Sequence, residues 1–137
     1  MDIPQIFRGV TVLVVDDHRT TRYVAGLVLE KHGATVLEAE DGSVALQLLA
    51  VHRIDAIVSD VQMPKLDGFG LLRALGYPSP KAGTPPVHLH SSVPGDFQAD
   101  ADSLSVPLHS KGNLLTGLAP QVAALIGIPY PGFPSAP

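Results

Sequence analysis

Residues 10–17 read Val-Thr-Val-Leu-Val-Val-Asp-Asp, a short apolar run that ends in two adjacent acids. A second such run, residues 55–59, reads Asp-Ala-Ile-Val-Ser, and Asp60 follows it directly. Runs of about four to eight mostly apolar residues, rich in Val and Ile, are typical of strands buried on both faces of a parallel sheet. Parallel strands end at the same edge of the sheet, so we expect Asp16, Asp17 and Asp60 to meet there.

Three carboxylates gathered at one edge indicate a cation site, because like charges repel one another at close range. Oxygen ligands with few basic neighbours favour a hard cation, most simply Mg²⁺. Asp16 and Asp17 could instead cap the helix that follows them, since aspartate is a good N-cap residue.

Strands and helices alternate along the chain, which predicts βαβ units and a parallel sheet. The predicted strands are 10–15, 34–37, 56–59, 87–90 and 106–110, and the predicted helices are 20–31, 44–51, 69–75, 95–102 and 113–126. Pro107 fits the edge of a sheet better than its centre, because proline cannot donate a hydrogen bond. With the fifth strand at an edge, the doubly wound α/β order 2-1-3-4-5 follows, with strands one and three as neighbours.

The last two predicted helices are the least regular. The segment 95–102 has a weak apolar stripe, so we expect a short or irregular helix there. The segment 113–126 contains Gly117 and Pro120, and a proline inside a helix removes one hydrogen bond. We expect either a kink at Pro120 or a helix that begins late.

The composition indicates one globular domain. The chain has 137 residues, of which 45% are hydrophobic, enough for one buried core. A net charge of -4 argues against a nucleic-acid partner, and the absence of cysteine excludes disulfides and thiolate zinc sites. No apolar stretch reaches the roughly 18 residues of a membrane span, and the first residues do not resemble a signal peptide. We therefore expect a cytoplasmic protein without a membrane partner.

Charges and prolines are unevenly distributed. Seventeen of the 22 charged residues, 9 basic plus 13 acidic, precede Pro78, and none follows Lys111. We expect the uncharged tract 114–128 to be a core helix face, with a partner surface or a homodimer contact as the alternative. The segment 129–137 contains four prolines and is expected to be a tail or linker.

Further motifs lie in a fixed order along the chain, at strand ends or at the start of a helix: Asp60, Met63-Pro64 with Asp67-Gly68, Ser91-Ser92 and Lys111. The spacing from Asp60 to Met-Pro-x-x-Asp-Gly is the most specific of these. Together with the acidic pair, they make residues 8–127 resemble the receiver domain of two-component response regulators, which has a flavodoxin-like fold. Residues 128–137 would then form a proline-rich tail or linker. Asp67-Gly68 itself is expected to be a turn and helix cap.

The resemblance implies a phosphoacceptor signalling domain. Asp60 would receive a phosphoryl group from a histidine kinase or a histidine phosphotransfer protein, and the change would alter binding to an unknown output protein or domain. Such a domain catalyses only its own phosphorylation and dephosphorylation, so it is not an enzyme with a separate substrate.

The resemblance also implies roles for the other motif residues. The ligands of Mg²⁺, or alternatively Mn²⁺, would be Asp16, Asp17, Asp60 and the backbone carbonyl of Gln62. Lys111 would bind the incoming phosphoryl group. Ser91 would be the hydroxyl that moves toward it, and Ser92 is small enough to leave room for that approach.

Two positions depart from the family pattern. Gly112 follows Lys111 where the family usually has proline, often after a cis bond; since a cis bond without proline costs about 2.5–4 kcal/mol, a trans bond is expected. Leu108 stands where the family usually has Tyr or Phe. The last third is also poor in charge, so the alternative is an atypical receiver that acts as a phosphorylation-independent interaction or autoregulatory module, for instance within a hybrid sensor kinase.

Other readings of the motifs are weaker. His88 and His90 share one strand face, and with His109 they could form a metal site, although their spacing matches no strong zinc pattern. His18 is expected at the rim of the acidic pocket. A haloacid-dehalogenase-type phosphatase would need Asp-x-Asp, but His18 stands two residues beyond Asp16. A flavin carrier would need a glycine- and hydroxyl-rich loop where this chain is acidic.

Overall fold

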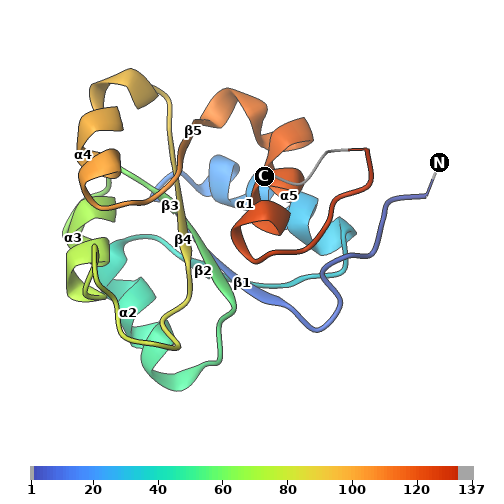
Figure 1. Ribbon diagram of the computed structural model, residues 1–137, viewed down its shortest axis with the longest axis horizontal. Helices are drawn as coiled ribbons and strands as arrows, with labels where there is room; N and C mark the ends of the chain where they lie inside the picture. The colour runs from blue at the N-terminus through green and yellow to red at the C-terminus, as the bar shows by residue number, and fades with distance from the viewer. Residues whose placement is uncertain (1, 133–137) are drawn as a thin grey trace.

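The structure is a computed structural model that describes residues 2–132 (Figure 1). Five strands form one parallel sheet in the order β2-β1-β3-β4-β5. The strands are β1 (Thr11–Val15), β2 (Thr35–Ala39), β3 (Ala56–Asp60), β4 (Val87–Ser91) and β5 (Leu108–Ser110). The helices are α1 (Arg19–Lys31), α2 (Gly42–Val51), α3 (Gly68–Ala74), α4 (Gln98–Ser103) and α5 (Leu114–Leu125). The predicted doubly wound, flavodoxin-like order is confirmed.

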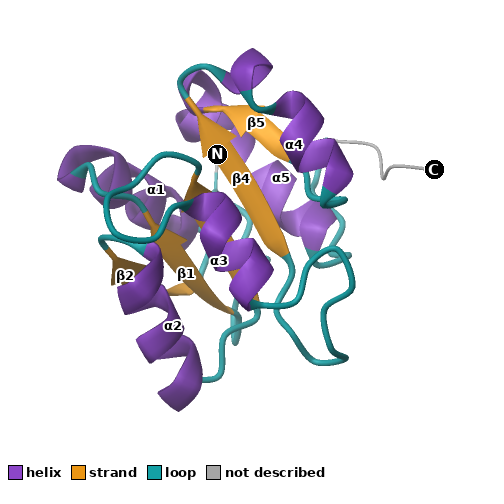
Figure 2. Ribbon diagram, turned by 90° about the vertical axis from the view of Figure 1, so that its left-hand side faces the viewer, coloured by secondary structure: helices purple, strands orange, loops and turns teal. Residues whose placement is uncertain are grey.

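The sheet separates two hydrophobic cores, one under α2, α3 and α4 and the other under α1 and α5 (Figures 1 and 2). Strand β1 supplies both cores: Val12 and Val14 face α1 and α5, whereas Leu13 and Val15 face the opposite side. Burial on both faces explains why its sequence is continuously apolar rather than alternating.

Strand β5 lies at the edge of the sheet and is shorter than predicted. The backbone N–H of Val106 donates to Ala101 O at 3.1 Å, so this residue belongs to the turn after α4. Pro107 has no N–H, but its carbonyl accepts from Leu89 N at 2.9 Å. The regular strand therefore begins at Leu108 instead of Val106.

Helix α4 is short, as expected, and begins later than predicted because residues 94–96 form a separate 3-10 turn. Helix α5 begins at Leu114 and runs through Pro120, so a late start is wrong. Its buried residues face α1, which confirms the prediction of a core helix face: Leu114, Leu118, Ala119, Val122 and Ala123. Leu115 points outward and is 77% exposed.

Segments outside the regular elements also pack on the domain. Phe7 is fully buried in the core under α1 and α5, and Ile128 and Tyr130 pack against the same core. The rest of the predicted tail, 133–137, lies outside the described residues. Within residues 2–132, no helix is long and apolar enough to cross a membrane.

Candidate functional site

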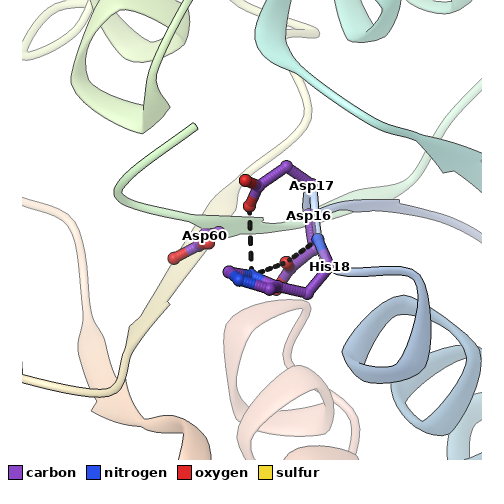
Figure 3. Close-up of side chains that lie close together, drawn as sticks. All are labelled: Asp16, Asp17, His18 and Asp60. Atoms are coloured by element: carbon purple, nitrogen blue, oxygen red, sulfur yellow. Dashed lines mark hydrogen bonds and ion pairs between the residues drawn. The ribbon is translucent and has the colours of Figure 1, made fainter. Parts of the chain in front are cut away.

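An acidic cluster lies where β1 and β3 end (Figure 3). Asp16 directly follows β1, and Asp60 is the last residue of β3, the neighbouring strand. Ligand atoms of Asp16, Asp17, His18 and Asp60, one from each side chain, lie within 4.8 Å of one another. The prediction that the three acids meet at one edge is confirmed, and their spacing suits a single cation.

Lys111 reaches into this cluster from the far edge of the sheet. It begins the 3-10 turn Lys111–Asn113 that follows β5, and its Nζ lies 3.0 Å from Asp16 Oδ2 and 3.0 Å from Asp60 Oδ2. Burial alone would lower the pKa of Lys111, but its hydrogen bonds to both carboxylates and their charges raise the pKa above its usual value. With all three acids ionised, the cluster carries three negative charges and one positive charge, a net charge of −2 that matches a divalent cation.

Several polar groups hold Asp16 in place. Its Oδ1 accepts the His18 backbone N–H at 2.8 Å, its Oδ2 lies 3.2 Å from His90 Nε2 and contacts Lys111, and its carbonyl accepts Arg22 Nη1 at 2.7 Å. Burial would raise the pKa of Asp16, but the hydrogen bonds from His90, the His18 amide and Lys111 outweigh it and lower the pKa to about 2. Asp16 is therefore ionised although its side chain is fully buried.

Asp60 behaves differently from Asp16. Burial raises its pKa, and the charge of Asp16 adds to this increase, against the opposing hydrogen bond from Lys111. Its backbone is fixed by Gly68 at the start of α3: the Gly68 N–H donates to Val61 O at 2.8 Å, and a Cβ at Gly68 would collide with the carbonyl oxygen of Asp60. Tight packing of α3 on the acceptor strand therefore requires glycine at position 68.

The structural role expected for Asp67 is confirmed. It is the N-cap of α3, and its carboxylate accepts the Gly70 N–H at 2.7 Å. By contrast, neither acid of the pair caps α1, because the N-cap residue is His18, which makes no side-chain cap bond. The capping alternative for Asp16 and Asp17 is wrong.

Ser91 is the last residue of β4 and is buried, whereas Ser92 is exposed. The Ser91 Oγ accepts the Val93 N–H at 3.0 Å, so the hydroxyl is engaged with its own loop. Gln62 is an exposed residue two positions beyond Asp60. The switch role of Ser91 and the ligand role of the Gln62 carbonyl stay predictions.

The turn that carries Lys111 does not use a cis peptide. Among the described residues the cis bond is Tyr77–Pro78, and Lys111–Gly112 is trans, as expected. The Ser110 Oγ accepts the Gly112 N–H at 3.1 Å, and this bond holds the turn together. The two ion pairs of Lys111 then fix its side chain without the usual proline.

The histidines do not form the metal site considered above. His88 Nε2 lies 2.6 Å from His109 Nδ1, and the two rings stack with centroids 4.7 Å apart. His90 turns to Asp16 instead. Within residues 2–132 the acidic cluster is the group with metal-site spacing, so a three-histidine site is wrong. His18, as expected, lies at the rim with its side chain 68% exposed.

Comparison with known proteins agrees with this geometry. Residues 12–94, more than half of the chain, match the sequence model described as the response regulator receiver domain. The chain belongs to this family.

Similar proteins place the receiver domain in several contexts. The chain is 47% identical over 67 residues to the response regulator MprA of Mycobacterium ulcerans, and the match covers 49% of this chain and 29% of that protein. It is 38% identical over 105 residues to the gliding motility regulatory protein of Myxococcus xanthus, covering 75% of this chain and 13% of that one. The chain thus spans less than a third of the curated relatives it matches.

A solved structure extends the likeness beyond residue 94. The signal receiver domain of a signal transduction histidine kinase from Syntrophus aciditrophicus is 28% identical, with a TM-score of 0.73, covering 93% of this chain and 96% of that one. The last third of this receiver domain, which includes Lys111, therefore keeps the family fold.

Proposed function

We propose that this receiver domain accepts a phosphoryl group on Asp60 from a phosphohistidine and changes its partner contacts while phosphorylated. The observation that carries the proposal is the contact of one ammonium, that of Lys111, with both Asp60 and Asp16 inside a cluster of net charge −2. Phosphoryl transfer asks mainly for alignment and charge neutralisation, and this arrangement supplies both.

The acidic residues fit a hard divalent cation because their donors are oxygens spaced for one ion. Receiver domains generally use Mg²⁺ with such acidic residues, and Mn²⁺, which takes the same oxygen ligands, is the alternative. Here the cation would be held by Asp16, Asp17, Asp60 and the backbone carbonyl of Gln62. When bound, it would neutralise charge that develops on the phosphoryl oxygens.

Asp60 and Lys111 have separate roles in the transfer. A carboxylate oxygen of Asp60 forms a bond to phosphorus as the phosphorus–nitrogen bond of the donor breaks, and the donor imidazole keeps the electron pair and takes up a proton. Lys111 exchanges its contact with the Asp60 oxygen for one with a phosphoryl oxygen. Water later hydrolyses the acyl phosphate, which restores the Asp60 carboxylate and releases inorganic phosphate, so the domain acts only on itself and is not an enzyme with a separate substrate.

The signal would pass through β4. The Ser91 hydroxyl, which now accepts from Val93, would donate to the new phosphoryl oxygen and draw the loop before α4 with it. A charge-assisted hydrogen bond of this kind shifts the population between two states. In the family, the Tyr or Phe ring at the position of Leu108 usually moves after such a change. Leu108 has no ring, so we expect β4 and its loop to carry more of the response.

The expected donor is a histidine kinase or a histidine phosphotransfer protein, in line with relatives that include the probable histidine kinase 4 of Oryza sativa. The competing function is a phosphorylation-independent interaction or autoregulatory module. Leu108 and the uncharged helix α5 favour this alternative, and a homodimer through the C-terminal third, which carries no charged side chain after Lys111, belongs to it.

The two functions differ in their response to a phosphoryl analogue. Isotope-labelled protein is titrated with Mg²⁺ and then with beryllofluoride, and amide shifts are recorded by NMR. Our proposal predicts large shifts at Asp60 and Ser91 that spread into α4, with Asp60→Asn unresponsive to beryllofluoride. Shifts confined to the Mg²⁺ step would support the phosphorylation-independent module.

A further inference from the structure

One buried side chain contacts the acidic cluster without belonging to its motif. His90 lies on β4, immediately before Ser91 and opposite Asp60 of β3, and is 1% exposed. Its Nε2 lies 3.2 Å from Asp16 Oδ2, and its Nδ1 is buried without a hydrogen-bond partner among the described residues. Burying a polar ring at this depth costs free energy, so we expect its one polar contact, with Asp16, to serve the structure or the function of the site.

The contact indicates which nitrogen of the ring is the donor. Asp16 is a carboxylate, which only accepts hydrogen bonds, so the His90 nitrogen that faces it carries the proton. In this tautomer the other ring nitrogen, Nδ1, is the buried atom without a partner among the described residues. This is the arrangement in which the charge-assisted bond to Asp16 is kept and an unpaired buried N–H is avoided.

The two oxygens of Asp16 consequently have different surroundings. Oδ2 receives both His90 and Lys111, at 3.2 and 3.0 Å. Oδ1 accepts the His18 amide, and it lies 3.3 Å from the His18 Nδ1, which is itself 3.2 Å from Asp17 Oδ1. His18 thus links Oδ1, and not Oδ2, to the carboxylate of Asp17.

We propose that His90 is a positioning residue for the cation site: by donating to Asp16 Oδ2, it fixes the carboxylate so that Oδ1 is presented to the ion together with Asp17. This inference rests on the proposed function, since it assigns a role toward the same cation. His90 acts through Asp16 and touches neither the ion nor the phosphoryl group. Because it directly precedes Ser91, it also ties the cation site to the strand end that is proposed to move.

The chain offers a matched control. His88 lies on the same face of β4, is also 1% exposed and also has a buried Nδ1 without a partner. Its Nε2 contacts His109 rather than Asp16. Replacing either histidine by valine removes a buried imidazole from β4, but only His90→Val removes a contact with the acidic cluster.

The test is a Mg²⁺ titration followed by NMR amide shifts for wild type, His90→Val, His90→Gln and His88→Val. Groups that orient a metal ligand typically contribute tenfold or more to affinity, so we expect His90→Val to weaken Mg²⁺ binding about tenfold. His90→Gln, whose amide can donate from nearly the same place, should recover most of this loss, and His88→Val should bind as wild type does. Equal Mg²⁺ affinity in His90→Val and wild type would overturn the proposal, as would equal weakening in His88→Val.

A second measurement needs no variant and so does not depend on folding. Long-range proton–nitrogen NMR of the wild-type rings reports which nitrogen of His90 is protonated, and we expect Nε2. A ring protonated only at Nδ1 would overturn the inference. Failure of the proposed function is distinct, since wild-type protein would then show no response to beryllofluoride after Mg²⁺ has been added, whatever the Mg²⁺ affinities of the His90 variants.

Discussion

The ammonium of Lys111 lies 3.0 Å from a carboxylate oxygen of Asp60 and 3.0 Å from one of Asp16. One positive charge thus joins the proposed phosphoacceptor on β3 to a proposed cation ligand after the neighbouring strand β1, although Lys111 itself follows β5 at the edge of the sheet. The acidic cluster depends on this lysine for charge balance, and the two functions of the site, cation binding and phosphoryl transfer, should respond to it in opposite directions.

Replacing Lys111 by methionine should separate these two functions. The net charge of the cluster changes from −2 to −3, so Mg²⁺ should bind more tightly, while phosphorylation loses a fixed charge on the transferring group and should slow about 10²-fold or more. Calorimetric Mg²⁺ titration and the rate of labelling by acetyl phosphate measure the two effects. A parallel loss of both would contradict the assigned role, because it would indicate collapse of the site.

Gly68 should be intolerant of any side chain. The Cβ of Gly68→Ala would collide with the Asp60 carbonyl, so α3 or the end of β3 must shift, and overpacking of this kind costs about 1–3 kcal/mol. We expect a matching fall in the free energy of unfolding and slower phosphorylation. Gly95→Ala is the control, since nothing lies within 4 Å of its added Cβ. Equal stability of the two variants would show that the close approach is not a constraint.

The cap of α2 should contribute measurably to stability. The Asp41 carboxylate accepts the N–H groups of Ser43 and Val44 at 2.8 and 3.0 Å and also the Ser43 hydroxyl. Asp41→Ala should lower the free energy of unfolding by about 1–2 kcal/mol, whereas Asp41→Asn keeps an acceptor and should lose less. Urea denaturation at pH 7 measures both, and identical values for the two variants would exclude a capping role.

His88 should make the fold sensitive to acid. Burial lowers its pKa to about 3, and the nearby His109 and His90 add to this effect. Between pH 6.5 and 3 the unfolded chain binds a proton at His88 that the folded chain does not, so stability falls as the pH drops, by about 1.4 kcal/mol per pH unit. His88→Leu should therefore lose about 2 kcal/mol less than wild type between pH 7 and 5. Urea midpoints that fall by the same amount in the two proteins between pH 7 and 5 would contradict this.

The sequence was sufficient for the sheet order and for the meeting of Asp16, Asp17 and Asp60, because buried parallel strands and their shared edge follow from local patterns. The same reasoning placed Lys111 at the end of β5, and its two ion pairs are consistent with the role that the resemblance implied for it.

Contacts between segments that are distant along the chain could not be predicted from local sequence patterns. Arg22 holds the carbonyl of Asp16 from α1 and pairs with Glu38 at 3.0 Å, yet a lone arginine on a helix gives no such signal. His90 could have been singled out as a polar residue inside a buried strand. Its partner, however, depends on the register of β4 against β3, which the sequence does not show. The path of α5 through Pro120 was decided by packing of its apolar face on α1, which outweighs one missing hydrogen bond.

Mass spectrometry of the protein after reaction with acetyl phosphate in the presence of Mg²⁺ tests the central claim most directly. The account predicts one added phosphoryl group, located by peptide mapping on Asp60, and no label when EDTA is present or when Asp60 is replaced by Asn. Label on another residue, or no label under conditions in which a second receiver domain in the same tube is phosphorylated, would contradict it.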